Sequence, residues 1–194
     1  MNITVDDMSL VLRALTFAAQ KHKGKKRKDK EASPYINHLI EAAEILWNIG
    51  KIHNSVAIAA GILHDTLEDT DTSGEELEAE FGGEISTIVQ ELTDDKSLPN
   101  EERKRLQVEH AKSLSLGARL VKLADKISNI QDIVDSPPED WSIERRKEYV
   151  EWGGEVINEL RGTNEYLERY FDDLCNTARL RLKEDEERDK LKTM

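Results

Sequence analysis

The chain has 194 residues, a formal net charge of −12 at pH 7, 35% charged residues and 5% aromatic residues. This length suits a single domain whose core needs no disulfide, and Cys175 is the only cysteine, so the cytoplasm is the expected location. No run of about 18 apolar residues could span a membrane, and no secretory signal is expected at the N-terminus. The acidic charge argues against general binding to nucleic acid, which needs a broad basic surface.

The low content of Gly and Pro, 10 and 4 residues, favours a helical protein. Apolar residues at helical spacing predict a first helix over residues 6–21. A basic segment follows over residues 21–30, in which seven of ten residues are Lys or Arg. Such a run is usually a solvated loop, but on an acidic protein it is also a candidate for binding a phosphorylated nucleotide.

The next two helices are predicted over residues 35–48 and 54–67. His38 aligns with Ala42 and Ile45, so its side chain is expected to point inward. A single inward histidine is normally a hydrogen-bonded core residue. For His38 to be a metal ligand, other ligating residues must come from another helix. The third helix is rich in small residues around Gly61, which would let a neighbouring helix approach closely and bring His64 near it.

Further helices are expected from Ser73, which opens a capping box, and over residues 85–92, 99–112 and 117–134. Two more follow the break at Pro137-Pro138, and the last ends in a charged helical tail over 183–194 that is expected to fray. The sequence contains no internal repeat and no credible strand pair. We therefore predict one all-α domain over 1–194, a bundle of about eight to ten helices with its core over about 8–170.

The segment from Gly61 to Thr70 carries four ionisable side chains at the end of an apolar stretch. On a continuous helix, His64 would lie over Glu68, and Asp65 over Asp69. A solvated acidic helix end is the plain alternative. A metal site with a general base is favoured over it, because the residues before the cluster read as a buried helix.

A polar stripe on the helix over 117–134, consisting of Lys122, Asp125 and Asn129, is either its solvated face or aimed into a site. With His38 and His64-Asp65, Asp125 would complete a site of two imidazoles and two carboxylates. This donor set suits Mn²⁺ or Fe²⁺, while Zn²⁺ and Mg²⁺ are ranked behind them. Glu68 and Asp69 would then orient and deprotonate water.

These residues carry a resemblance to the HD superfamily of metal-dependent phosphohydrolases and, more narrowly, to the hydrolase domain of the RelA/SpoT family. The stand-alone small alarmone hydrolases, including the metazoan SpoT-homologue type, are the most similar subgroup, and the match runs over about residues 8–170. The matching segments are Arg27-Lys28, Pro34 to His38, Leu63 to Thr70, Phe81-Gly82, Thr93 to Lys96, Glu102 to Glu109, Val121 to Asn129, and Trp141-Ser142 through Glu148-Tyr149.

The resemblance implies a cytoplasmic (p)ppGpp 3′-pyrophosphohydrolase of the stringent response that uses Mn²⁺ and releases GDP or GTP and pyrophosphate. It implies metal ligands at His38, His64, Asp65 and Asp125, and activation of water by Glu68 and Asp69. It also implies nucleotide contacts at Arg27 and Lys28, with Asn129 near the ribose or base. Lys96, Lys122 and Arg145 fall in matching segments and are predicted phosphate contacts.

Two departures and two alternatives accompany this prediction. Residues 29–33 make the basic segment longer than in the bifunctional enzymes, and the chain has no room for their synthetase domain, so we expect degradation of alarmone without synthesis. One alternative is hydrolysis of a related nucleotide, either (p)ppApp or NADPH as a 2′-phosphatase. The other is a non-catalytic nucleotide-binding module, which the complete set of six metal and water-activating residues disfavours. A homodimer is left open.

Overall fold

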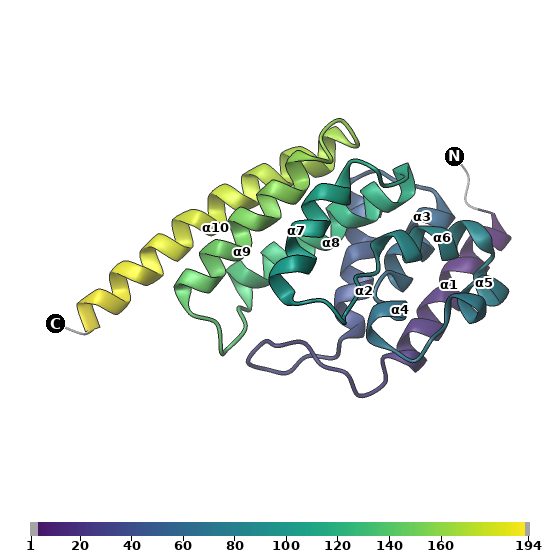
Figure 1. Ribbon diagram of the computed structural model, residues 1–194, viewed down its shortest axis with the longest axis horizontal. Coiled ribbons are helices and arrows are strands. Elements are labelled where there is room, and N and C mark those ends of the chain that lie inside the picture. Colours follow the sequence, from purple (N-terminus) through teal and green to yellow (C-terminus); the bar gives the residue numbers. More distant parts are fainter. Residues whose placement is uncertain (1–3, 193–194) are drawn as a thin grey trace.

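The computed structural model describes residues 4–192, which fold into an all-α bundle (Figure 1). Its helices are α1 (Val5–Lys21), α2 (Ile36–Glu44), the π-helix η1 (Ile45–Ile49), α3 (Ser55–Leu63), α4 (Thr66–Asp69), α5 (Gly74–Phe81), α6 (Gly83–Leu92), α7 (Asn100–Ala111), α8 (Leu116–Asp135), α9 (Ile143–Asn158) and α10 (Glu165–Lys192). Within 4–192 an isolated bridge between Lys26 and Pro34 is the only β-type pairing, and no helix is both long and apolar enough to cross a membrane. The all-α prediction, with eight to ten helices, is confirmed.

Side-chain caps fix where several helices begin. Thr4 and Asp7 form a reciprocal capping box at α1, and the Ser73 side chain accepts the Glu76 N–H at α5, as the sequence predicts. Ser115 and Ser142 cap α8 and α9 in the same way. These serines accept N–H groups that the first helical turn leaves unpaired, so the elements begin at defined residues.

The second predicted helix differs from the observed one, because α2 gives way to a π-helix before Gly50. The Gly50 N–H donates to the Ile45 carbonyl at 2.9 Å, and a Cβ on Gly50 would lie 2.9 Å from the Leu46 carbonyl oxygen. The wider turn lets the backbone pass closely under Leu167 of α10. Hydrophobic periodicity over so few residues does not distinguish the two helix types.

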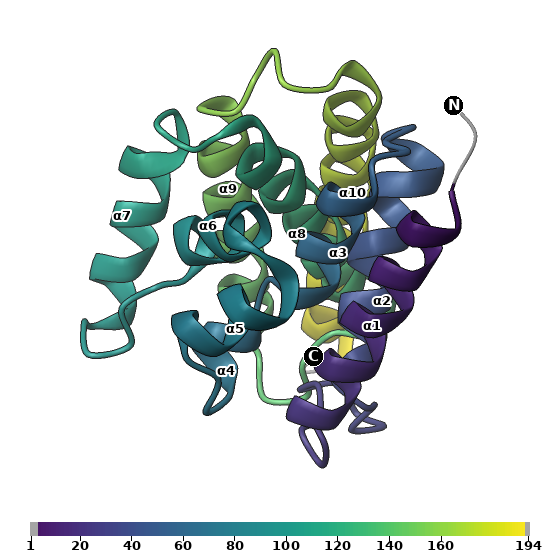
Figure 2. The same ribbon diagram turned by 90° about the vertical axis from the view of Figure 1, so that its right-hand side faces the viewer.

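Helices α3 and α8 occupy the centre of the molecule, with α7 on the outside (Figure 2). Every residue of α3 from Ala57 to Leu63 is buried, and α8 packs against α2, α3, α6, α9 and α10. Gly61 faces Leu46, whose Cδ1 would lie 2.8 Å from a Cβ at that position. The predicted close approach of small residues therefore brings α3 against the α2–η1 segment.

Helices α9 and α10 pack against each other and against α8, and the C-terminal part of α10 projects beyond the rest of the bundle (Figure 1). The charged tail is helical as far as Lys192, and residues 193 and 194 lie outside the described part. Lys147 Nζ lies 2.7 Å from Glu186, and Arg146 lies 3.6 Å from Asp185. These ion pairs connect the start of the tail to α9.

Candidate active site

The predicted metal-binding motif lies at a break between two helices, which corrects the sequence-based prediction of one helix through Leu67. Helix α3 ends at Leu63, and α4 begins at Thr66. Asp65 adopts φ −94° and ψ 1°, and the Gly61 carbonyl, which a continuing helix would use for the Asp65 N–H, accepts from His64 Nδ1 at 2.7 Å. The break changes the direction of the chain, so that Asp65 starts the turn that carries Glu68.

Two helices and the turn after α3 bring the four predicted metal ligands together. His38 comes from α2, His64 and Asp65 from the break after α3, and Asp125 from the middle of α8. Ligand atoms of His38, His64 and Asp65 all lie within 4.8 Å of one another. The Nε2 atoms of His38 and His64 lie 3.3 and 3.5 Å from Asp125 Oδ1, and 3.6 and 3.2 Å from Asp65 Oδ2.

The orientation of both imidazoles fits a divalent metal ion. His38 Nδ1 and His64 Nδ1 are engaged outward, by Ser128 Oγ at 2.8 Å and the Gly61 carbonyl at 2.7 Å. His64 Nε2 is buried and has no hydrogen-bond partner, although it faces the carboxylates of Asp65 and Asp125. A buried nitrogen without a hydrogen bond but near carboxylate oxygens is the arrangement that a metal ion completes.

The electrostatics of the metal-free cluster point to the same conclusion. Burial lowers the pKa of His64, but the negative charges of Asp65 and Asp125 outweigh it and raise that pKa to about 10. Burial raises the pKa of Asp65, yet the neighbouring His64 holds it below its usual value. The cluster therefore stabilises the ionised forms of Asp65 and Asp125 together with a positive charge beside them. That charge can be a protonated His64 or a metal ion.

Glu68 lies beside this cluster, and its environment suits a base. Its Oε2 accepts the Asp94 N–H at 3.2 Å, while Oε1 lies 3.7 Å from both Lys96 Nζ and Arg103. Burial raises the pKa of Glu68 in spite of the Asp94 hydrogen bond, which lowers it. A carboxylate with a raised pKa accepts a proton from water more readily than an ordinary one.

Asp69, the other predicted water-activating residue, points elsewhere. Its carboxylate forms an ion pair with Lys96 and lines a cavity beside the basic segment, not the one around the cluster. Lys96, a predicted phosphate contact, is half exposed in the same adjacent cavity. The catalytic role of Asp69 stays a prediction, and the structure places it as a partner of Lys96.

The basic segment forms a loop that is joined to α8 by Arg27. The guanidinium pairs with Asp132 through both Nε and Nη2, and Nη2 also donates to Asn129 Oδ1 at 2.9 Å. Asn129 Nδ2 in turn donates to Asp125 at 2.6 Å. These partners engage Nε and Nη2 of Arg27, which lines the adjacent cavity beside the basic segment, and its nucleotide contact stays a prediction. The Lys28 side chain forms no ion pair or hydrogen bond among the described residues, and it lines the cavity at the cluster.

A cavity of about 260 Å³ opens onto the four ligands and Glu68. Six cationic side chains line it, namely Lys28, Arg103, Lys104, Lys122, Lys126 and Arg145. Lys126 Nζ lies 3.2 Å from Asp125 Oδ2 and 4.5 Å from the centroid of the Trp152 ring. Lys122 is buried, has no ion pair or hydrogen bond among the described residues, and has its pKa lowered by burial and by Lys126.

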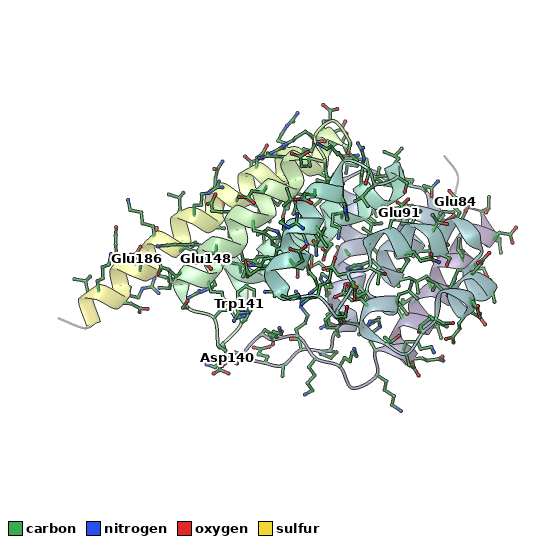
Figure 3. The ribbon with its side chains drawn as sticks, viewed as in Figure 1. Glu84, Glu91, Asp140, Trp141, Glu148 and Glu186 are labelled. Atoms are coloured by element: carbon green, nitrogen blue, oxygen red, sulfur yellow. The ribbon has the colours of Figure 1, made fainter. Side chains whose placement is uncertain are left out.

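Aromatic rings also line the cavity, where they lie against some of the cationic side chains. Trp141, Tyr149 and Trp152 follow one another with ring centroids 5.3 and 5.2 Å apart, and Arg145 stacks over Trp141 at 4.4 Å. Trp141 lies in the loop after α8, beside the loop that follows α1 (Figure 3), and the Glu139 N–H donates to the Lys28 carbonyl across this boundary. The two loops thus meet at the mouth of the cavity.

Residues 14–150 match the protein-family model described as HD domain. The chain belongs to the HD-domain family. Its relatives include the guanosine-3′,5′-bis(diphosphate) 3′-pyrophosphohydrolases MESH1 of Xenopus tropicalis, 51% identical over 86% of this chain and 93% of the relative, and of Homo sapiens, 51% identical over 81% and 88%. The MESH1 of Drosophila melanogaster is 44% identical over 84% of this chain and 91% of the relative.

Solved structures agree with the HD-domain assignment. A metazoan orthologue of SpoT that hydrolyses ppGpp and plays a role in starvation responses superposes with a TM-score of 0.83, at 43% identity, over 86% of this chain and 93% of that one. The lmo0812 protein of Listeria monocytogenes EGD-e superposes with a TM-score of 0.60, at 26% identity, over 75% and 99%. The resemblance to the metazoan SpoT homologues is confirmed.

Sequence reasoning missed several residues of this HD domain that contact the predicted ligands or line the cavity. Tyr35 OH donates to Asp65 at 2.7 Å, and Ser128 contacts His38. Spacing offered a signal for some of them, because Ser128 is three residues beyond Asp125, and Lys126 is four beyond Lys122, on adjacent turns of α8. Arg103 and Lys104 gave no such signal, since α7 reads as a uniformly charged helix.

Proposed function

We propose that the protein is a Mn²⁺-dependent guanosine-3′,5′-bis(diphosphate) 3′-pyrophosphohydrolase, which degrades (p)ppGpp to GDP or GTP and pyrophosphate. The observation that carries the proposal is the combination, in one cavity, of the four-ligand cluster, the base Glu68 and a cationic wall. The names of the MESH1 relatives, about half identical to this chain along most of its length, supply the substrate.

The ligands proposed for the ion are His38, His64, Asp65 and Asp125. Two imidazoles and two carboxylates, with no thiolate, favour Mn²⁺ among the common divalent ions, ahead of Fe²⁺, Zn²⁺ and Mg²⁺. When bound, the ion would polarise a phosphoryl oxygen and lower the pKa of water. The buried Nε2 of His64, which has no hydrogen-bond partner in the protein, supports this assignment.

The residues of the chain account for the other parts of the reaction. Glu68 would accept a proton from the water that attacks the phosphorus next to the ribose 3′ oxygen. The bond between that oxygen and phosphorus breaks, the 3′ oxygen takes up a proton, and the water oxygen leaves in pyrophosphate. The cationic wall, with Lys122 buried and unpaired, would hold the phosphates of a substrate that carries at least four.

The aromatic wall suits the remaining part of the substrate. The faces of Trp141 and Tyr149 line the same cavity as the ligands, and a nucleobase can stack on such rings. Asn129 also lines the cavity, and it would lie near the ribose or base. The small volume and polar lining favour a single nucleotide over a polymer.

The test is hydrolysis of ppGpp by purified protein that has been stripped with a chelator and then resupplied with Mn²⁺, with products separated by anion-exchange chromatography. We expect GDP and pyrophosphate, no turnover without metal and recovery with Mn²⁺. Parallel reactions with ppApp and NADPH measure base and phosphate selectivity. Intact ppGpp together with turnover of either of those two nucleotides would overturn the guanine assignment.

A further inference from the structure

A chain of hydrogen bonds runs from buried His38 through buried Ser128 to half-buried Glu41, on the side away from the proposed metal. His38 Nδ1 lies 2.8 Å from Ser128 Oγ, and Ser128 Oγ lies 2.7 Å from Glu41 Oε2. Ser128 is fully buried, and His38 is 2% exposed. Neither Glu41 nor Ser128 has a part in the proposed reaction or in substrate binding, so these hydrogen bonds need another explanation.

The chemistry of the three groups fixes the direction of the protons. An ionised carboxylate can only accept, so the Ser128 hydroxyl donates its proton to Glu41. The Ser128 oxygen then accepts the proton of His38 Nδ1. In a neutral imidazole, the nitrogen without a proton is the one that can bind a metal. These hydrogen bonds therefore leave His38 Nε2 without a proton. Its lone pair faces Asp65 Oδ2 at 3.6 Å and Asp125 Oδ1 at 3.3 Å.

The placement of the residues links two helices at this point. Glu41 is three residues beyond His38 on α2, and Ser128 is three residues beyond Asp125 on α8, so each lies one turn from a proposed ligand. His64 differs, because a backbone carbonyl holds its Nδ1. The orientation of His38 thus depends on two side chains, and a substitution can change it without touching the ligands.

We propose that Ser128 and Glu41 are positioning residues for the metal, which hold His38 in the tautomer and rotamer that bind the ion. This inference rests on the metal site of the proposed function. Partners of this kind typically contribute 10- to 100-fold in metal affinity. Ser128→Ala should therefore weaken Mn²⁺ binding by about 10- to 100-fold. Glu41→Gln should weaken it also, because the amide can donate to Ser128 Oγ and turn the hydroxyl proton toward His38.

The experiment measures the Mn²⁺ dissociation constant of the chelator-stripped full-length protein, by titration with Mn²⁺ and electron paramagnetic resonance of the free ion. The matched control is Ser86→Ala, because Ser86 is also a buried helical serine, 1% exposed, and its hydrogen bonds go to the Gly74 carbonyl of α5 and to Gln90 of α6. Ser86→Ala should bind Mn²⁺ like the wild type. Thermal unfolding of each metal-free variant shows whether it is folded.

Each result decides the matter. Weaker binding in Ser128→Ala and Glu41→Gln, with Ser86→Ala unchanged, supports the proposal. Affinity within about twofold of the wild type in a folded Ser128→Ala, or equal weakening in all three variants, overturns it. If Ser128→Ala does not fold, Glu41→Gln carries the test. A wild type that binds Mn²⁺ but does not hydrolyse ppGpp removes the proposed activity and leaves this inference standing, whereas a wild type that binds no Mn²⁺ removes both.

Discussion

The contact between Gly61 and Leu46 should limit which residues α3 accepts where it packs against the α2–η1 segment, which carries the proposed ligand His38. A Cβ at residue 61 would lie 2.8 Å from Leu46 Cδ1, and Leu46 is fully buried. Gly61→Ala therefore overpacks the core, which typically costs about 1–3 kcal/mol. It also gains up to about 1 kcal/mol, because alanine is the better helix former.

A second glycine separates these two effects. Gly154 lies inside α9, and a Cβ there would meet nothing within 4 Å. Gly154→Ala should show the gain in helix propensity alone, so the difference between the two variants isolates the overpacking term of about 1–3 kcal/mol. For a chain of this size each kcal/mol shifts the Tm by about 2–4 °C, so Gly61→Ala should unfold roughly 2–12 °C below Gly154→Ala.

The assay is thermal unfolding of metal-free protein followed by far-UV circular dichroism, paired with a Mn²⁺ titration of each variant. We expect Gly61→Ala also to bind Mn²⁺ more weakly, since pushing α3 away from α2 separates His64 from His38. The reasoning fails if Gly61→Ala unfolds at the same temperature as Gly154→Ala and binds Mn²⁺ like the wild type. In that case Leu46 moves aside freely, and the close approach does not position the ligands.

The remaining predictions concern the reaction and the metal. Glu68→Gln should lower kcat for ppGpp by about 10²–10⁴ and leave Mn²⁺ affinity unchanged, and an unchanged kcat would exclude Glu68 as the base. The basic form of Glu68 is the active one and burial raises its pKa, so kcat/KM should rise with pH through a midpoint above about 4.3; a midpoint at that ordinary value contradicts this. Lys122→Met should raise the KM by about 10- to 100-fold by removing a charged phosphate contact, while the Tm should not fall, because a buried lysine is costly to desolvate. Saturation with Mn²⁺ at about 100 times its dissociation constant should stabilise the fold by about 2.7 kcal/mol, and a Tm that does not respond to chelator would argue against a bound ion.

The sequence predicted the all-α class, most helix positions and the meeting of His38, His64, Asp65 and Asp125, because these depend on apolar periodicity and on residue types that rarely coincide by chance. The break between α3 and α4 escaped it, since the turn depends on a hydrogen bond from the His64 ring to its own helix. The ion pair between Arg27 and Asp132 escaped it too. That pair joins residues far apart in the chain, and local sequence patterns do not predict such long-range contacts.

The four proposed ligands lie on segments that are widely separated along the chain, and Asp125 belongs to α8, which is also the central element of the bundle. A chain emerging from the ribosome therefore presents an incomplete coordination set until α8 has been synthesised and has docked. The ion cannot act as a template for the early helices. It would be acquired by a nearly finished domain, so metal shortage should yield folded, inactive protein rather than misfolded chains.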